Sequence, residues 1–224
     1  MRTADEFRQH RIDMLPHALQ RPGFFCGDGQ SADLYYTMIL SDLCWLDERE
    51  ADFATVVSEL LHGSLRVYGQ FFYQYLTIPD RFANEIASTY AQAAFRLGYY
   101  SPERLLTESE FEQLKRSIDH TFLTTDHTES EIVSQFGKPT HDVIGGQTTV
   151  HCYGCCDPNA SWVYFDYSRC NPPADPHSYE WFDDSKLRDI RRENNVMELL
   201  PYASWCHPQT VESKGHGVLS LLHK

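Results

Sequence analysis

The chain has 224 residues, of which 42% are hydrophobic and 13% aromatic, enough to form the core of one large domain or two small ones. Asp and Glu number 32 against 19 Lys and Arg, which gives a formal net charge of −13 and disfavours binding to nucleic acid phosphates or anionic lipid surfaces. No apolar run approaches the roughly 20 residues that cross a bilayer, and the charged first residues lack the apolar core of a signal peptide, so we expect a cytoplasmic protein that binds neither nucleic acid nor membranes.

The first 120 or so residues favour helices. Thr3-Ala-Asp-Glu6 is a capping box, which predicts a helix that continues to the break at Arg21-Pro22-Gly23. A second helix is predicted from near Ser31 to Trp45. A third, over residues 53–75, is so rich in apolar side chains that we expect it in the centre of the core.

Three further signals continue the helical pattern. A fourth helix is predicted to begin at Pro79-Asp80 and to end at Gly98, a residue suited to the left-handed conformation that closes a helix. Ser101-Pro102 is typical of an N-cap followed by proline in the first helical position. Thr107-Glu-Ser-Glu110 is a second capping box and predicts a helix through Ile118.

The pattern changes near Asp126. Thr128-Glu-Ser-Glu131 is a third capping box, for a short helix over residues 129–136 that Gly137-Lys-Pro139 ends. Residues 147–153 and 161–167 then alternate and are rich in β-branched and aromatic residues, which predicts two strands joined by a turn. Residues 186–195 fit either a charged helix or a strand, and residues 196–205 predict a final strand.

These elements predict an α+β protein, with a helical N-terminal part followed by a smaller antiparallel-sheet α/β part. We place a helical domain at residues 1–122 and a small α+β domain at residues 123–207. Residues 208–224 lack a periodic pattern and are expected to form a flexible tail.

One short motif lies between the first two predicted helices, at Arg21-Pro-Gly-Phe-Phe-Cys-Gly27. Proline ending a helix and glycine permitting a bend can account for it as a turn. The order Arg-Pro-Gly-aromatic-x-Gly also resembles that of small bacterial immunity proteins of polymorphic toxin systems, over the first 50 or so residues. The resemblance implies a role in bacterial competition, in which the protein binds and neutralises a cognate toxin.

Seven cysteines in a chain with no secretion signal favour reduced thiols over disulfides. Cys152-Tyr-Gly-Cys155 has the spacing of a zinc-binding pair, which Cys156, Cys170 or Cys206-His207 would complete. In the plainer alternative Cys152 packs as a small hydrophobe on a strand and its neighbours lie in the following turn. Because a strong zinc motif has two such pairs, we predict no metal and no cofactor, and keep a zinc- or thiol-dependent protein using residues 152–156 as the alternative function.

Catalytic motifs are absent from the sequence. It contains no Gly-x-Ser-x-Gly elbow, no phosphate-binding glycine-rich loop and no His-Glu-x-x-His. We therefore predict that the chain is not an enzyme and that it has no catalytic residue.

An acidic and aromatic segment follows a proline-rich loop. Trp and Tyr are favoured anchors of protein interfaces, and neighbouring carboxylates pair with Lys or Arg of a partner. In the plainer alternative, the carboxylates form a solvated face and the tryptophan belongs to the core. Two other acidic stretches occur: residues 47–52, and the group of Glu108, Glu110 and Glu112. The predicted partner-binding residues are Tyr179, Glu180, Trp181, Phe182, Asp183 and Asp184.

The leading hypothesis is therefore an immunity protein that masks the active surface of a cognate toxin, such as a basic nuclease, whose positive charge would complement this chain. An adaptor with no toxin partner is a further alternative. The sequence leaves the oligomeric state open.

Overall fold

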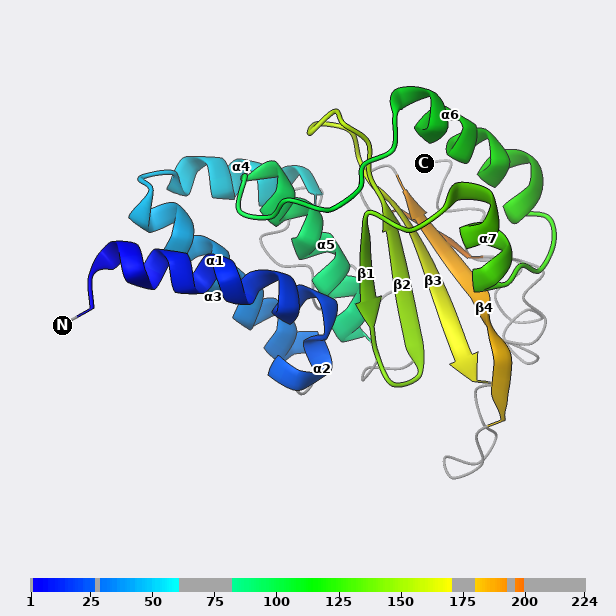
Figure 1. Cartoon of the computed structure of the whole chain (residues 1–224), viewed down its shortest axis with the longest axis horizontal. Coiled ribbons are helices and arrows are strands. Elements are labelled where there is room, and N and C mark those ends of the chain that lie inside the picture. The colour runs from blue at the N-terminus through cyan, green and yellow to red at the C-terminus, as the bar shows by residue number, and fades with distance from the viewer. Residues whose placement is uncertain (1, 27–28, 61–81, 171–179, 193–195, 200–224) are drawn as a thin grey trace, which may run out of the picture.

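The computed structural model describes residues 2–26, 29–60, 82–170, 180–192 and 196–199. In these residues a five-stranded antiparallel sheet has helices on both of its faces (Figure 1). The predicted α+β class is confirmed, with most helices ahead of the sheet in sequence. None of the described helices is long and apolar enough to span a membrane.

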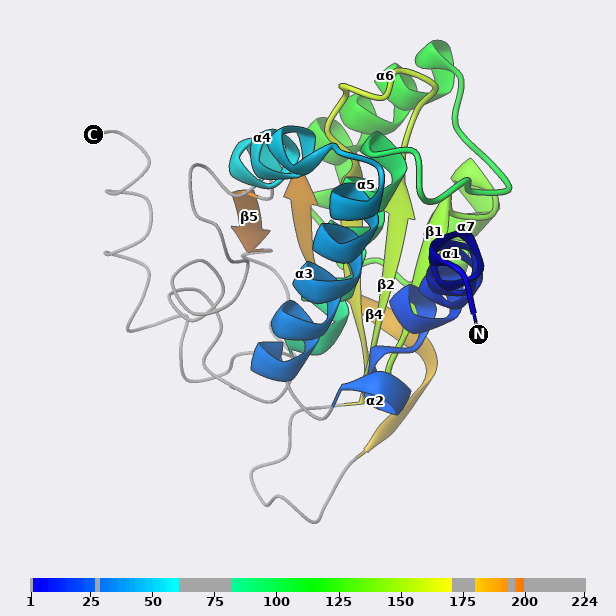
Figure 2. The ribbon, with the colours of Figure 1, turned by 90° about the vertical axis from the view of Figure 1, so that its left-hand side faces the viewer.

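One face of the sheet is covered by the N-terminal helices, with α5 running along it (Figure 2). The predicted capping box at Thr3 and Glu6 opens the first of them, and Gly98 adopts the expected left-handed conformation, with φ 77°, after the last. The helices are α1 (Ala4–Gln20), α2 (Pro22–Phe25), α3 (Gly29–Leu46), α4 (Glu50–Leu60) and α5 (Phe82–Arg96).

These helices and the sheet share one hydrophobic core. Leu15 of α1, Leu40 of α3 and Ala91 of α5 are fully buried in the same cluster as Val150 and Tyr164 of the sheet. Whether residues 1–122 and 123–207 are separate folding units stays a prediction.

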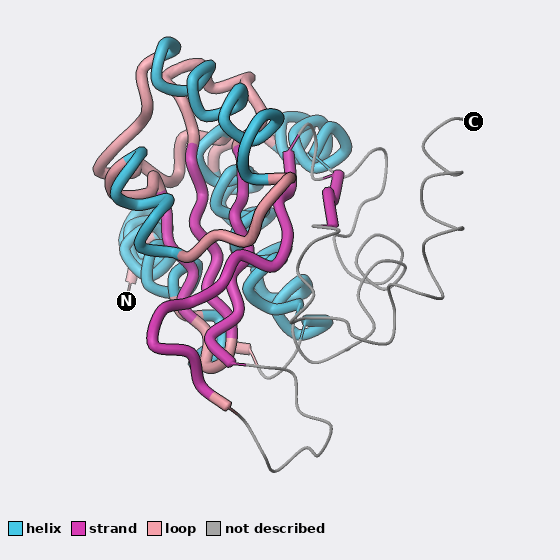
Figure 3. Tube along the Cα trace, turned by 90° about the vertical axis from the view of Figure 1, so that its right-hand side faces the viewer, coloured by secondary structure: helices cyan, strands magenta, loops and turns pink. Residues whose placement is uncertain are grey.

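The opposite face of the sheet is covered by α6 (Glu108–Ser117), the π-helical turn η2 (Ile118–Phe122) and α7 (Glu129–Phe136) (Figure 3). The predicted capping boxes open both α-helices, and Gly137, with φ 74°, ends α7 as expected. This face has its own core, in which Phe122 and Phe136 meet Phe165 of the sheet.

The strands are β1 (His141–Ile144), β2 (Thr148–Tyr153), β3 (Val163–Cys170), β4 (Trp181–Arg192) and β5 (Val196–Leu199), and their order in the sheet follows the sequence. The two strands predicted over residues 147–153 and 161–167 are confirmed as β2 and β3. The ambiguous stretch 186–195 belongs largely to β4, and the final predicted strand is β5 as far as Leu199. Strand β1 was not predicted.

One predicted helix is described only in part, and another differs from the structure. The third helix ends at Leu60 among the described residues, and the remainder of the predicted range, residues 61–75, lies outside them, as do Pro79 and Asp80. The helix predicted to begin at Ser101-Pro102 is wrong. Residues 101–105 are irregular instead, and Leu106 forms a parallel bridge with Cys155 and donates its N–H to the carbonyl of Gly154 at 2.8 Å.

Candidate functional site

The predicted partner-binding segment forms the beginning of β4. Glu180 is exposed and Trp181, which pairs with Cys170 of β3, is 58% exposed. Exposure alternates over the next residues, as expected in a strand: Phe182 is half-buried and Asp183 is exposed. Tyr179 lies outside the described residues. The segment therefore contains an exposed tryptophan flanked by two exposed carboxylates, and its role in binding a partner stays a prediction.

The two half-buried members of the segment have internal contacts. The ammonium of Lys186 lies 4.4 Å from the centroid of the Phe182 ring, a distance typical of a cation–π interaction. Asp184 accepts hydrogen bonds from the backbone N–H and the hydroxyl of Ser130, at the start of α7. Phe182 and Asp184 thus hold the segment in place, and Trp181 and Asp183 are the side chains it presents.

The electrostatics of Asp184 fit this structural role. Burial raises the pKa of its carboxyl, but hydrogen bonds from Ser130 and Thr128 outweigh the burial and leave the pKa below its ordinary value. The carboxylate lies at the first turn of α7, where the positive end of a helix favours negative charge. Neutralising Asp184 would consequently disturb α7 as well as the surface charge.

The same end of α7 is tied to β2. Glu129 accepts a hydrogen bond from Nε2 of the buried His151 at 3.1 Å, and this contact holds the pKa of Glu129 below its usual range. The His151 ring also packs edge-on against Tyr167, with centroids 5.0 Å apart. This histidine is a core residue with a carboxylate partner.

The cysteines do not gather into a metal site among the described residues. Cys152 is buried in the core under α5, whereas Cys155 belongs to the core on the opposite face of the sheet. Burial raises the pKa of both thiols, which disfavours the thiolate that metal binding and redox chemistry require. Cys156 is exposed, and Cys206 and His207 lie outside the described residues.

Residues 21–26 of the Arg21–Gly27 motif form a turn after α1, and Gly27 lies outside the described residues. Pro22 is buried in the first position of the one-turn helix α2, and the backbone N–H of Cys26 donates to its carbonyl at 2.7 Å. Phe25 stacks on Tyr35 of α3, with ring centroids 6.0 Å apart, and Phe24 is 80% exposed. The turn at Pro22 and the contact between Phe25 and Tyr35 therefore connect α1 with α3, and the ring of Phe24 lies mostly in solvent.

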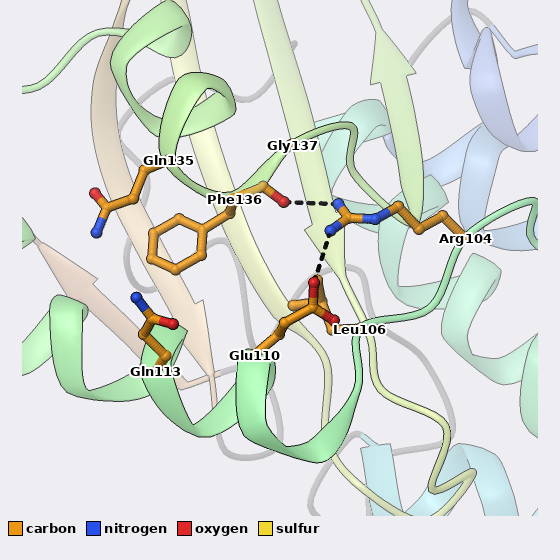
Figure 4. A pocket seen from close by; sticks show the side chains of 7 residues that line it. All are labelled: Arg104, Leu106, Glu110, Gln113, Gln135, Phe136 and Gly137. Atoms are coloured by element: carbon orange, nitrogen blue, oxygen red, sulfur yellow. Dashed lines mark hydrogen bonds and ion pairs between the residues drawn. The ribbon is translucent and has the colours of Figure 1, made fainter.

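A pocket of about 310 Å³ lies between α6 and α7 (Figure 4). Its one cation, Arg104, donates to the backbone carbonyl of Phe136 at 2.7 Å and lies 3.4 Å from a carboxylate oxygen of Glu110. The pocket's arginine is thus used to connect the loop before α6 to the end of α7. The remaining lining residues are Leu106, Gln113, Gln135 and Gly137.

Sequence patterns gave no sign of a buried group of charges between α5 and the sheet. Glu85 of α5, Asp166 of β3 and Asp189 of β4 are each at most 1% exposed, and they surround the guanidinium groups of Arg188 and Arg191. Charged residues on a strand are usually expected to face solvent. Only the register of β4 shows that Arg188, Asp189 and Arg191 face α5. The pairing shifts by one residue between Asp166 and Tyr167, which places both Arg188 and Asp189 near α5.

No protein-family model matches the chain, and comparisons with curated proteins and with solved structures give no match.

Proposed function

We propose that this chain is an immunity protein, which binds a cognate bacterial toxin and neutralises it by masking the toxin's active surface. The observation that carries the proposal is the exposed Trp181 at the start of β4, with exposed carboxylates at Glu180 and Asp183. Large aromatic rings rimmed by charge are the usual anchors of protein interfaces. The order of residues from Arg21 to Gly27, which resembles that of immunity proteins, supplies the class of partner.

The net charge of −13 supports a basic partner. Opposite charges increase the rate of encounter, and a basic nuclease has a positive surface because it must bind phosphates. An acidic protein bound over that surface would compete directly with the nucleic acid. No chemistry by this chain is needed for such inhibition.

The proposal predicts different kinetic roles for the ring of Trp181 and the carboxylate of Asp183. Trp181→Ala should raise the rate of dissociation from the cognate toxin, with a loss of affinity of about thirtyfold, as expected for truncation of a buried anchor. Asp183→Asn should lower the rate of association and its sensitivity to salt, because rim charges act mainly on encounter. Surface plasmon resonance at several salt concentrations measures both rates.

Two variants on α1 serve as matched controls. Phe7 is a 40% exposed aromatic and Asp13 an exposed carboxylate, and both lie on a helix far from the start of β4 (Figure 1). Phe7→Ala and Asp13→Asn should leave both rates within twofold of the parent's, an effect of less than about 0.5 kcal/mol. If Trp181→Ala folds and binds as tightly as the parent, β4 is not the interface.

A further inference from the structure

The outer face of α3 carries a row of exposed apolar side chains that the core does not use. Leu34 is 56% exposed, Met38 52% and Trp45 67%. Their spacing of four and then seven residues keeps them on one side of the helix, over a length of about 16 Å. The opposite side of α3 already supplies the core residues Tyr36, Ile39, Leu40 and Leu43.

A helix that is apolar on two sides and buried on only one is unusual in a protein that works alone. Exposed single apolar side chains need no explanation, but three on one side of a helix, ending in a tryptophan, form an apolar strip that Ser41 interrupts between Met38 and Trp45. Tryptophan is the residue most enriched among the strong contributors to protein interfaces. The strip therefore has the composition of a docking surface.

The strip ends at a turn whose carboxylates are of two kinds. Asp47 and Asp52 are each ion-paired with an arginine, at 2.7 and 2.8 Å respectively. Glu48 and Glu50 are exposed, and neither carboxylate forms a hydrogen bond or an ion pair with a described residue. Negative charge at one end of an apolar strip gives the surface a direction and a preferred partner charge.

The backbone at Glu48 is strained. Its φ of 57° lies in the left-handed region, and it is the only described residue other than glycine with a positive φ. Glycine takes this conformation without the steric cost that a side chain adds. A glutamate at this position, three residues after Trp45, is therefore kept at some expense in stability, as is common where a residue serves function.

We propose that Leu34, Met38, Trp45, Glu48 and Glu50, here called the α3 surface, dock an amphipathic helix of a basic partner protein. The apolar strip would pack against the partner's apolar face in the manner of helix recognition by residues at helical spacing. Lysine or arginine side chains next to that face would pair with the two glutamates. A second copy of this chain fits poorly, because it would bring another 13 net negative charges to the same interface.

The α3 surface is separate from the start of β4, and the inference rests on the proposed function only for the class of partner, a basic protein. The two surfaces lie at different ends of the molecule, one on the N-terminal helices and one on the sheet (Figure 1). A toxin large enough to cover both would be held by two tryptophans. The α3 surface can also bind its helix if the partner is not a toxin.

The test uses two synthetic peptides of about 18 residues, or five helical turns. Both have leucine at helical spacing, and the positions beside the leucines are lysine in one peptide and glutamate in the other. Calorimetry should show that the parent protein binds the lysine peptide, more weakly as salt is added, and does not bind the glutamate peptide. No binding of the lysine peptide, or equal binding of both, would overturn the proposal.

Variants locate the site. Trp45→Ala, and Glu48→Gln combined with Glu50→Gln, should each reduce affinity for the lysine peptide by about tenfold or more. The matched control is Phe7→Ala, which removes an exposed aromatic ring of α1 outside both surfaces and should leave peptide binding unchanged. Reduced binding with Trp181→Ala but not with Trp45→Ala would assign the peptide to β4 and contradict the α3 surface.

Two stability measurements complete the test. Trp45→Ala should not lower the thermal midpoint, whereas a large drop would show that the ring belongs to the core and would overturn the proposal. Glu48→Gly should raise the midpoint, because it relieves the strained φ, and should still weaken binding of the lysine peptide. Sedimentation should show a monomer. A dimer that Trp45→Ala dissociates would mean that the α3 surface binds a second copy of this chain, and would overturn the proposal.

Discussion

At the scale of single residues, the buried charges beneath α5 do not balance if all of them are ionised. Three carboxyls face two guanidinium groups: Arg191 binds both oxygens of Asp166, at 2.7 and 3.1 Å, and Arg188 is shared between Asp189 and Glu85. Asp166 and Asp189 are direct cross-strand neighbours in a buried site, and two adjacent carboxyl groups there favour a proton on one of them. We assign that proton to Asp189.

Burial is the main cause that raises the pKa of Asp189 well above its ordinary value of 3.8, and the neighbouring Asp166 raises it further. Burial also raises the pKa of Asp166, but the guanidinium of Arg191 outweighs it and keeps Asp166 ionised. Ser88 and Thr89 of α5 contact Arg191, and the ring of Tyr164 lies 4.4 Å below it. The protonated Asp189 therefore completes a neutral cluster.

This assignment predicts a specific dependence of stability on pH. A carboxyl whose pKa is raised by folding stabilises the protein fully below its unfolded pKa, and the contribution is lost as pH rises toward the folded pKa, by about 1.4 kcal/mol for each pH unit. Asp189→Asn fixes the neutral form, so its unfolding free energy should decline less steeply than the parent's from pH 5 to pH 8. Urea denaturation across this range measures the slope.

Asp166→Asn is the matched control, because the two residues face each other across the same pair of strands. It leaves the fully buried Arg191 without its ion partner and should cost about 3–5 kcal/mol. Asp189→Asn should cost much less, since Arg188 keeps Glu85. Equal losses in the two variants at pH 7 would mean that Asp189 is ionised.

At the scale of elements, the contact between α5 and the β1–β2 hairpin depends on one glycine. A Cβ on Gly145 would lie 2.2 Å from the side-chain nitrogen of Asn84 and 2.9 Å from the carbonyl oxygen of Thr148. Asn84 also donates to that carbonyl and to the Thr148 hydroxyl. Gly145→Ala should thus destabilise the fold by about 1–3 kcal/mol, as overpacking does.

Gly146 offers a control one residue away. A Cβ there would meet no atom within 4 Å, and its φ is not positive. Thermal unfolding should place Gly146→Ala within about 0.5 kcal/mol of the parent. If both alanine variants unfold at the parent's temperature, the hairpin does not press against α5 as described.

The helices could be predicted well because their signals are local. Capping boxes at Thr3, Thr107 and Thr128 and the left-handed glycines Gly98 and Gly137 place the helix ends within a residue or two of the structure. Strand β1 was missed because its four residues hold few apolar side chains. The pair Gly145-Gly146 before β2 is a hairpin signal that could have revealed it.

The candidate surfaces were harder to predict because exposure depends on tertiary packing. The segment at Trp181 was predicted from composition, yet only the structure separates Trp181 and Asp183, which are exposed, from Asp184, which caps α7. The α3 surface was not predicted. The sequence does contain a sign of it: Leu34 and Met38 lie on one side of a helix whose other side supplies the apolar core residues.

At the scale of the whole molecule, the fold is held by two cores on either side of one sheet, and no metal site was found among the described residues. The purified protein should contain no stoichiometric zinc, and its circular dichroism and thermal midpoint should be unchanged in excess chelator. Mass spectrometry under native conditions measures the metal content. One equivalent of zinc, lost together with structure, would support the cysteine-based alternative.

The acidity of the molecule, its exposed Trp181 and the resemblance of its Arg21–Gly27 motif all support the proposed inhibition of a basic toxin. The direct measurement is a titration of the cognate toxin, in which the toxin's own activity is followed as this protein is added. We predict that activity falls linearly and vanishes at one equivalent, at protein concentrations well above the dissociation constant. Undiminished toxin activity in the presence of a large excess of folded protein would contradict the account.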